Sequence, residues 1–263
     1  MNIKEKNGVK YCSFENIESL GFVNHGFSTR VGGVSKGVFE SLNVGKTRGD
    51  DIKDVEENIC RIADAIGFDE KNIVCGKQVH ENKILKVTKE NMHTPNLEGY
   101  DGYITNEKGI VLTTFHADCV PIFLADKETK AIAMVHSGWR GTAKRICQEA
   151  VKAMENEYGT KAENISAAIG PSIGMCCFQV DMPVIEEFRK TVDFVDDYYK
   201  IDENAPGHFK MDLWGINKKL LEEAGVKDIE VTDICTMCRE DLFFSHRKMG
   251  NDRGTMAAYI CIK

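Results

Sequence analysis

The sequence has few features of a membrane, exported or nucleic-acid-binding protein. No run reaches about 18 uninterrupted apolar residues, and the start MNIKEKNGVKYCSF has no apolar segment of roughly 7 to 15 residues of the kind found in signal peptides. With 34 Lys and Arg against 41 Asp and Glu, the formal net charge is -7, so no overall basic field exists to hold nucleic acid or an anionic membrane. We therefore expect a cytoplasmic globular enzyme for a small substrate, with no partner protein evident.

Two familiar motifs are incomplete. Val44-Gly-Lys-Thr47 ends like a phosphate-binding P-loop, but the glycine required five residues before Gly45 is replaced by Glu40. Cys235-Thr-Met-Cys238 has the C-x-x-C spacing, yet no second such pair and no H-x3-5-H pair stands at zinc-finger distance, which argues against a structural zinc there. The ten cysteines are expected to stay reduced, most of them as small buried apolar side chains.

The spacing of apolar residues indicates both helices and strands, and five prolines, no internal repeat and no low-complexity tract leave no obvious linker. A period of 3.6 predicts helices over 52–66, 142–158, from about Pro183, and over 213–224. Apolar, β-rich runs predict strands over 110–115, 120–125, 131–136, 165–169, 229–234 and 256–262. We expect one α+β domain over residues 1–263, with helices packed outside the sheets.

The stretch HADCVPIFLADKETKAIAMVHSGWRG (116–141) contains two of these strands with chemically active residues at their ends. If the strands form a hairpin in which Ala125 faces Lys130, Cys119 lies directly opposite His136. Their Cβ atoms would then be roughly 4.5 to 5.5 Å apart, which suits two ligands of one ion. A catalytic zinc needs a third protein ligand, for which His25, His80 and His246 remain. The alternative is that Cys119 and His136 are buried, hydrogen-bonded side chains.

Several motifs, in order along nearly the whole chain, together resemble the laccase-domain family. They are HGFSTRVGGVS (25–35), SLNVG (41–45), KQVH (77–80), HADCVPIFLAD (116–126), VHSGWRG (135–141), AIGPSIG (168–174) and ICT (234–236). Members of this family were once called multicopper polyphenol oxidases and are now described as purine nucleoside phosphorylases with adenosine deaminase activity. The resemblance implies mixed, sandwich-like β-sheets flanked by helices, related to the catalytic domain of cytotoxic necrotizing factor.

The resemblance also implies roles for individual residues. It places the family's metal ligands at His80, Cys119 and His136, and its catalytic and substrate-side residues at Arg30 and Asn43. On this reading Cys119 is also a catalytic residue, the metal is Zn²⁺ with Cu²⁺ possible, and the substrates are purine nucleosides and phosphate.

Further residues are candidates for the phosphate side of the site. Arg140 and Arg30 carry guanidinium groups that pair bidentately with oxyanions, and Gly141 would open a helix whose N-terminus favours an anion. A surface salt bridge is the alternative role for Arg140, and a flexible surface turn is the alternative for the glycine-rich loop that carries Arg30. Ser172 stands where many relatives have cysteine; it can hydrogen-bond but cannot be a strong thiolate ligand, and whether Cys176 or Cys177 compensates is open.

Several chemistries remain in competition. A zinc site would lower the pKa of bound water toward about 7 and serve adenosine deamination, although the H-x-E and P-C-x-x-C deaminase signature is absent; Asp118 is a candidate for proton transfer or for a supporting role. Copper-dependent phenol oxidation is the second hypothesis, but none of the seven histidines forms an H-x-H pair. A cysteine or metal hydrolase that edits peptidoglycan precursors, with Cys119 as nucleophile and His136 as base, is the third. A purely structural zinc is the fourth.

Overall fold

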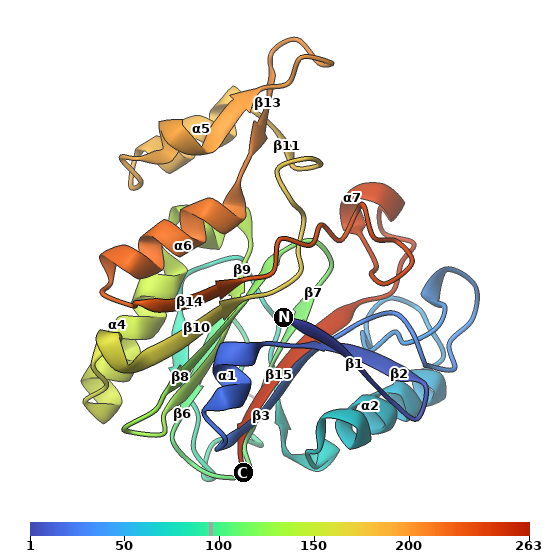
Figure 1. Cartoon of the computed structure of the whole chain (residues 1–263). Coiled ribbons are helices and arrows are strands. Elements are labelled where there is room, and N and C mark those ends of the chain that lie inside the picture. Colours follow the sequence, from blue (N-terminus) through green and yellow to red (C-terminus); the bar gives the residue numbers. More distant parts are fainter. Residues whose placement is uncertain (95–96) are drawn as a thin grey trace.

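The computed structural model describes residues 1–94 and 97–263, and two six-stranded sheets form its centre (Figure 1). Sheet A has the strand order β1-β2-β3-β15-β7-β4, in which the strands are β1 (Asn2–Lys6), β2 (Val9–Ser13), β3 (Val23–Ser28), β15 (Met256–Ile262), β7 (Val111–His116) and β4 (Ile73–Val74). Sheet B has the order β14-β10-β8-β9-β6-β5, made of β14 (Asp228–Val231), β10 (Ile165–Ile169), β8 (Val120–Asp126), β9 (Ile132–Ser137), β6 (Gly102–Thr105) and β5 (Ile84–Lys86). Both sheets mix parallel and antiparallel pairs.

The two sheets share one apolar core. Phe27 and Leu112 of sheet A belong to the same buried cluster as Phe123 and Met134 of sheet B, and all four side chains are fully buried. Alternate residues of a strand point to opposite faces, so each sheet also has an outer face that needs cover. This arrangement is the sandwich that the family resemblance implies.

Helices cover both outer faces. Helix α2 (Ile52–Ile66) packs Ile62 and Ile66 against Tyr259 of sheet A, while helices α4 (Ile146–Tyr158) and α6 (Leu213–Glu223) share a cluster with the outer side chains of β8 and β9. The layer order is therefore helix, sheet, sheet, helix, as Figure 1 shows. The α+β class with helices outside the sheets is confirmed, and the relation to cytotoxic necrotizing factor stays a prediction.

The remaining elements are short. A three-stranded sheet, β11-β13-β12, projects with helix α5 beyond the two large sheets; its members are β11 (Gln179–Asp181), β12 (Tyr199–Ile201), β13 (His208–Met211) and α5 (Met182–Arg189). The other helices are α1 (Glu15–Ser19), α3 (Trp139–Ala143) and α7 (His246–Met249), with 3-10 turns at Gly37–Phe39, Glu70–Asn72, Ala162–Asn164 and Val195–Tyr198. Within residues 1–94 and 97–263, no helix combines the length and the apolar character needed to cross a membrane.

One predicted helix has the wrong bounds. Residues 142–158 were expected to form one helix, but α3 ends at Ala143 and α4 begins at Ile146, because Arg145 between them has the left-handed φ of 60°. A left-handed residue cannot continue a right-handed helix. Helix α3 also starts at Trp139 and has only five residues, so the anion-favouring dipole expected at Gly141 is not supported by a long helix.

Candidate metal centre and active site

The hairpin of β8 and β9 forms as predicted, but in a different register. Ala125 pairs with Ile132 and Pro121 pairs with His136, so Cys119 is not directly opposite His136. The turn causes this difference. The Asp126 N–H donates to the Ala131 carbonyl at 2.8 Å, so Asp126 and Ala131 pair and the loop begins one residue later than predicted. A shift of two residues preserves the faces of the strands, so Cys119 and His136 still meet.

The chain brings His80, Cys119 and His136 together. One ligand atom from each of these side chains lies within 4.8 Å of the others. Cys119 ends the short passage from β7 in sheet A to β8 in sheet B, where Asp118 has a φ of 88°, and His80 sits in a turn with a φ of 61°. Gly138 lies against both, because a Cβ there would be 2.6 Å from His80 Nδ1 and 3.3 Å from Cys119 Sγ. The centre thus lies where the chain crosses between the two sheets.

The other histidines considered as third ligands lie elsewhere. His25 Nε2 accepts a hydrogen bond from the Phe14 N–H at 2.9 Å, and burial lowers the pKa of His25 to about 4. His246 is exposed, and its Nδ1 lies 2.9 Å from the Gly250 carbonyl. The ring of His116 lies 5.2 Å from that of His136, but both of its nitrogens are engaged, with Thr114 Oγ1 at 2.8 Å and the Cys119 carbonyl at 3.0 Å. His80 is therefore the histidine that joins the pair.

Asp101, which the motif analysis missed, orients two of the three residues. Its Oδ1 lies 2.8 Å from His136 Nδ1 and accepts the His80 N–H at 3.0 Å, and its Oδ2 accepts the N–H groups of Val79 and Glu81 at 3.1 and 3.0 Å. Burial raises the pKa of Asp101, but the hydrogen bonds from His136 and the backbone outweigh it and lower the pKa overall. A carboxylate on Nδ1 fixes the tautomer of His136 and directs Nε2 toward the centre.

The surroundings shift the pKa values of the two imidazoles at the centre in opposite directions. Burial lowers the pKa of His136, but the charge of Cys119 and the hydrogen bond with Asp101 raise it to about 9 overall. Burial and the nearby His136 lower the pKa of His80, which keeps this imidazole neutral. A metal ion bound to His136 would replace the proton that its raised pKa retains, because a histidine ligand must be neutral.

Asp118 is a buried residue that fixes the short passage from β7 to β8. It is buried, and its carboxylate accepts hydrogen bonds from Thr236 Oγ1 at 2.6 Å, Ser245 Oγ at 3.0 Å and the Arg247 N–H at 2.6 Å. These contacts join the Cys119 turn to the segment that runs from β14 into α7. They agree with the supporting role considered for Asp118.

Arg30 and Asn43 lie in the glycine-rich loop and contact residues both inside and outside it. The Arg30 guanidinium donates to the carbonyls of Glu40 and Glu240 at 2.8 and 3.1 Å and stacks over Phe244 at 4.5 Å. Asn43 is fully buried; its Oδ1 accepts the Gly45 and Thr255 N–H groups, and its Nδ2 donates to Asp50 Oδ2 at 2.8 Å. Both side chains have structural partners in addition to the substrate roles that the resemblance implies.

Arg140 and Ser172 differ in their access to the centre. Arg140 is exposed, stacks over Trp139 at 4.2 Å, and its charge contributes to lowering the pKa of His80. Ser172 is fully buried, and its Oγ accepts a hydrogen bond from Trp214 Nε1 at 2.5 Å and donates to the Gly170 carbonyl at 3.4 Å. Ser172 therefore contacts the protein interior, and its substrate role stays a prediction.

Arg253 is a second residue that the motif analysis missed. It is 5% exposed, its Nη1 donates to the Gly254 carbonyl at 2.9 Å, and its Nε has no hydrogen-bond partner among the described residues. Burial and the positive charge of Arg48 lower the pKa of Arg253 to about 10, while Asp118 and Cys119 oppose that shift. A buried guanidinium that is still charged at neutral pH is suited to binding an oxyanion.

Comparison with known proteins supports the resemblance. The family model described as "Multi-copper polyphenol oxidoreductase laccase" matches residues 24–263. The chain belongs to this family. The protein named purine nucleoside phosphorylase YlmD from Geobacillus stearothermophilus is 38% identical over 243 residues, which are 89% of this chain and 88% of that protein.

Two further relatives bear on structure and activity. The crystal structure of YlmD from Geobacillus stearothermophilus matches with a TM-score of 0.90 and 36% identity, covering 99% of this chain and 98% of that one. A protein named adenosine deaminase RL5, from an unknown prokaryotic organism, is 32% identical over 237 residues, covering 87% of this chain and 90% of that protein. The family relationship therefore spans most of the described fold.

Proposed function

We propose that the protein is a zinc-dependent purine nucleoside phosphorylase that converts adenosine, inosine or methylthioadenosine and phosphate into the free base and a ribose 1-phosphate. The observation that carries the proposal is the convergence of His80, Cys119 and His136, with Asp101 behind His136. The activities of the relatives named purine nucleoside phosphorylase support it.

The donor set fits a catalytic metal. Two imidazoles and one thiolate are ligands that suit zinc, and three protein ligands leave a fourth position open. A zinc ion bound there would supply Lewis acidity and lower the pKa of a bound water. The tautomer of His136, fixed by Asp101, leaves Nε2 free for coordination, and His80 is exposed on one side. Copper remains the alternative metal, since the same ligands can hold it.

The arginines of the site provide the phosphate side of the proposed reaction. In phosphorolysis an oxygen of inorganic phosphate bonds to the ribose C1′, the bond from C1′ to the purine nitrogen breaks, and the base leaves with its bonding electrons and takes up a proton. The charge of Cys119 acts on Arg253 and the charge of Arg140 acts on His80, and we propose that these two guanidinium groups bind the phosphate dianion. Arg30 and Asn43 are proposed to contact the nucleoside, as the family resemblance implies.

Adenosine deamination is proposed as a second activity of the same centre. The relative named adenosine deaminase RL5 supports it. A water delivered to C6 of adenosine would release ammonia and leave inosine, which is itself a substrate of the proposed phosphorolysis. The two reactions differ in their need for phosphate, so they can be assayed separately.

A cysteine hydrolase is the other candidate, and one observation favours it. Asp101, His136 and Cys119 lie in the order carboxylate, imidazole and thiol, which is the arrangement of a nucleophilic cysteine with its base and orienting group. A thiolate bound to a metal is not free to attack a substrate. The metal content of the active protein therefore separates the two mechanisms.

The test combines metal analysis with a substrate panel. The protein is purified without added metal, its bound metals are measured, and zinc-loaded and copper-loaded samples are incubated with adenosine, inosine and methylthioadenosine, with and without phosphate. We expect phosphate-dependent release of free base by the zinc form, and its loss in Cys119→Ala but not in Cys60→Ala, an exposed cysteine of α2. Absence of turnover for every nucleoside, or unchanged turnover in Cys119→Ala, would overturn the proposal.

A further inference from the structure

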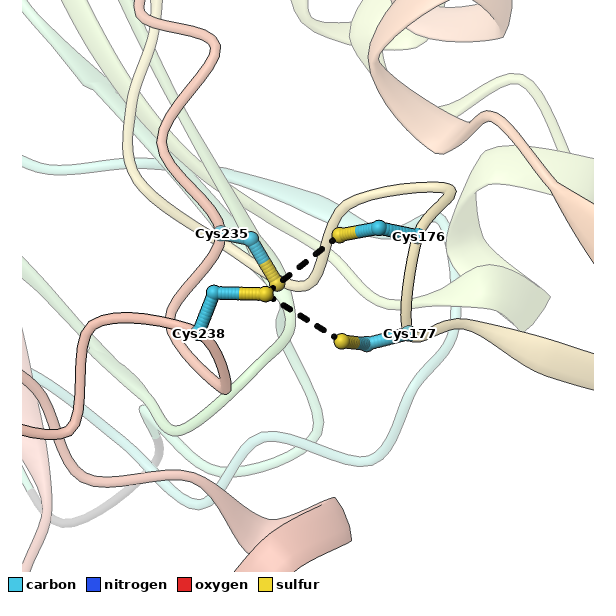
Figure 2. Close-up of side chains that lie close together, drawn as sticks. All are labelled: Cys176, Cys177, Cys235 and Cys238. Carbon is cyan, nitrogen blue, oxygen red and sulfur yellow. Dashed lines mark hydrogen bonds between the residues drawn. The ribbon is translucent and has the colours of Figure 1, made fainter.

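A second cluster of thiols lies apart from the His80–Cys119–His136 centre. Cys176 and Cys177 follow Gly174 in the turn before β11, and Cys235 and Cys238 follow β14. Figure 2 shows the four side chains pointing toward one another from these two segments. The C-x-x-C pair that lacked a partner in the sequence thus finds one, and the partner is an adjacent pair about 60 residues earlier in the chain.

The spacing of the sulfur atoms matches a tetrahedral metal site. Cys238 Sγ lies 3.4 Å from Cys177 Sγ and 3.6 Å from Cys176 Sγ, and all four sulfur atoms lie within 4.8 Å of one another. A tetrahedron with zinc–sulfur bonds of about 2.3 Å has sulfur–sulfur edges of about 3.8 Å. A disulfide would need a separation of about 2.05 Å, and all four cysteines are free thiols.

The backbone around the cluster fixes both segments. The Ser172 N–H donates to the Ile234 carbonyl at 3.3 Å and the Thr236 N–H donates to the Ser172 carbonyl at 3.0 Å, so the two segments pair next to Cys235. The N–H groups of Cys177 and Phe178 donate to the Gly174 carbonyl at 2.9 Å, which closes the turn that carries the first thiol pair. The cluster is therefore positioned by main-chain contacts, independently of any attraction between thiols.

Cys235 is the most enclosed of the four thiols. It is buried, whereas Cys177 is half-buried and Cys176 and Cys238 are exposed. Gly174 is closely packed there, because a Cβ would lie 2.7 Å from the Trp214 ring and 3.3 Å from Cys235 Cβ.

We propose that Cys176, Cys177, Cys235 and Cys238 bind a structural zinc ion, separate from the proposed catalytic metal. Four thiolates form a closed tetrahedral set with no position for substrate, which is the usual form of a structural zinc site. Each thiol that binds releases its proton, and no oxidation or reduction takes place. The site requires neither the proposed reaction nor the other metal.

At this location the proposed zinc would connect two segments that are distant in the sequence. It would join the connection between β10 and β11 to the segment after β14, and Thr236, next to Cys235, donates to Asp118 beside Cys119. The same segment continues to Ser245 and Arg247, which hold the other oxygen of Asp118. Binding of zinc to the four cysteines would therefore stabilise the scaffold that supports the Cys119 turn.

The experiment counts zinc ions in matched variants of the full chain. The protein and its variants Cys176→Ser, Cys238→Ser, Cys119→Ala and Cys60→Ser are purified under reducing conditions, and zinc per chain is measured by elemental mass spectrometry. Wild type and Cys60→Ser should carry two zinc ions, Cys176→Ser and Cys238→Ser one, and Cys119→Ala one. If wild type carries a single zinc that both Cys176→Ser and Cys238→Ser remove and Cys119→Ala retains, this proposal stands and the proposed catalytic metal fails.

A second measurement covers the case in which a serine variant does not fold. Cobalt is titrated into metal-free Cys119→Ala, which keeps the four cysteines. One equivalent should give the strong near-ultraviolet thiolate-to-cobalt absorption and the visible bands of tetrahedral cobalt, and adding zinc should abolish both. Absence of these bands, iron as the bound metal, or a mass lower by two hydrogens that shows a disulfide would overturn the proposal.

Discussion

At the scale of single residues, Asp101 has the strongest influence on the proposed metal centre without being one of its ligands. It connects the tautomer of His136 to the backbone of the His80 turn through four contacts. Its position could not be predicted from a motif, because Asp101 precedes β6 and reaches His136 only through the pairing of β6 with β9. The motifs and the family resemblance predicted the three ligands, and the long-range sheet pairing revealed the residue that contacts two of them.

Replacing Asp101 tests that orienting role. Asp101→Asn removes the charge and one acceptor, so we expect zinc affinity and kcat to fall about 10- to 100-fold with a smaller change in KM. Asp126→Asn is the matched control: Asp126 is equally buried and caps the hairpin turn through Glu128 and Thr129, away from the centre. Zinc affinity that falls equally in both variants would show a general loss of stability instead.

Gly138 offers a second test at this scale. A Cβ at Gly138 would press on His80 Nδ1 at 2.6 Å and on Cys119 Sγ at 3.3 Å, so Gly138→Ala should displace two ligands and weaken zinc binding by about tenfold or more. Gly141→Ala, three residues later in α3, would place its Cβ 3.3 Å from the Glu81 carbonyl and 3.4 Å from Ile146. Calorimetric zinc titration should distinguish the two, and equal affinities would contradict the close packing described.

At the scale of elements, the spacing of apolar residues predicted the bounds of helix α2 correctly. Its bounds, Ile52–Ile66, and its end at Gly67 with a φ of 94° agree with the apolar spacing, because one helix face must be buried. The hairpin of β8 and β9 was predicted too, but its register was displaced by two residues. Apolar alternation identifies the buried face but does not decide where the turn closes, and the capped turn at Asp126 decides it here.

Helix α2 also organises the loop that carries Arg30 and Asn43. Asn58, on its buried face, accepts the Val34 N–H at 2.8 Å and donates to Ser35 Oγ, the Ser41 carbonyl and the Asn43 carbonyl at 2.8, 3.2 and 2.8 Å. No sequence motif marks it, since an asparagine in a helix is ordinarily a surface residue. The loop is thus held by a helix residue rather than by its own glycines alone.

Removing this side chain should loosen the loop. Asn58→Ala leaves buried backbone groups without partners, so we expect the free energy of unfolding to fall by about 3 kcal/mol, measured by urea denaturation. Limited proteolysis should then cut within residues 33–43 more rapidly than in wild type. Cys60→Ala, at an exposed position of the same helix, should change neither result. Unchanged stability of Asn58→Ala would show that the loop does not depend on α2.

At the scale of the whole molecule, the proposed centre lies where the chain passes between its two large sheets. Cys119 follows β7 of sheet A and precedes β8 of sheet B, His136 lies in β9, and Arg253 precedes β15, which pairs with β7. His136 therefore belongs to a strand, Cys119 and Arg253 lie just outside strand ends, and His80 is held by Asp101. The class of fold was predictable from the sequence. How the two sheets meet, and how the two cysteine pairs meet, depends on contacts between distant segments.

The measurement that tests the central proposal most directly is the fate of phosphate during turnover. Zinc-loaded protein is incubated with inosine and inorganic phosphate, and the products are followed by phosphorus NMR and by chromatography of the base. The account predicts ribose 1-phosphate and hypoxanthine in equal amounts, both absent in Cys119→Ala and in the reaction without phosphate. Hypoxanthine accompanied by free ribose, or formed at the same rate without phosphate, would contradict it.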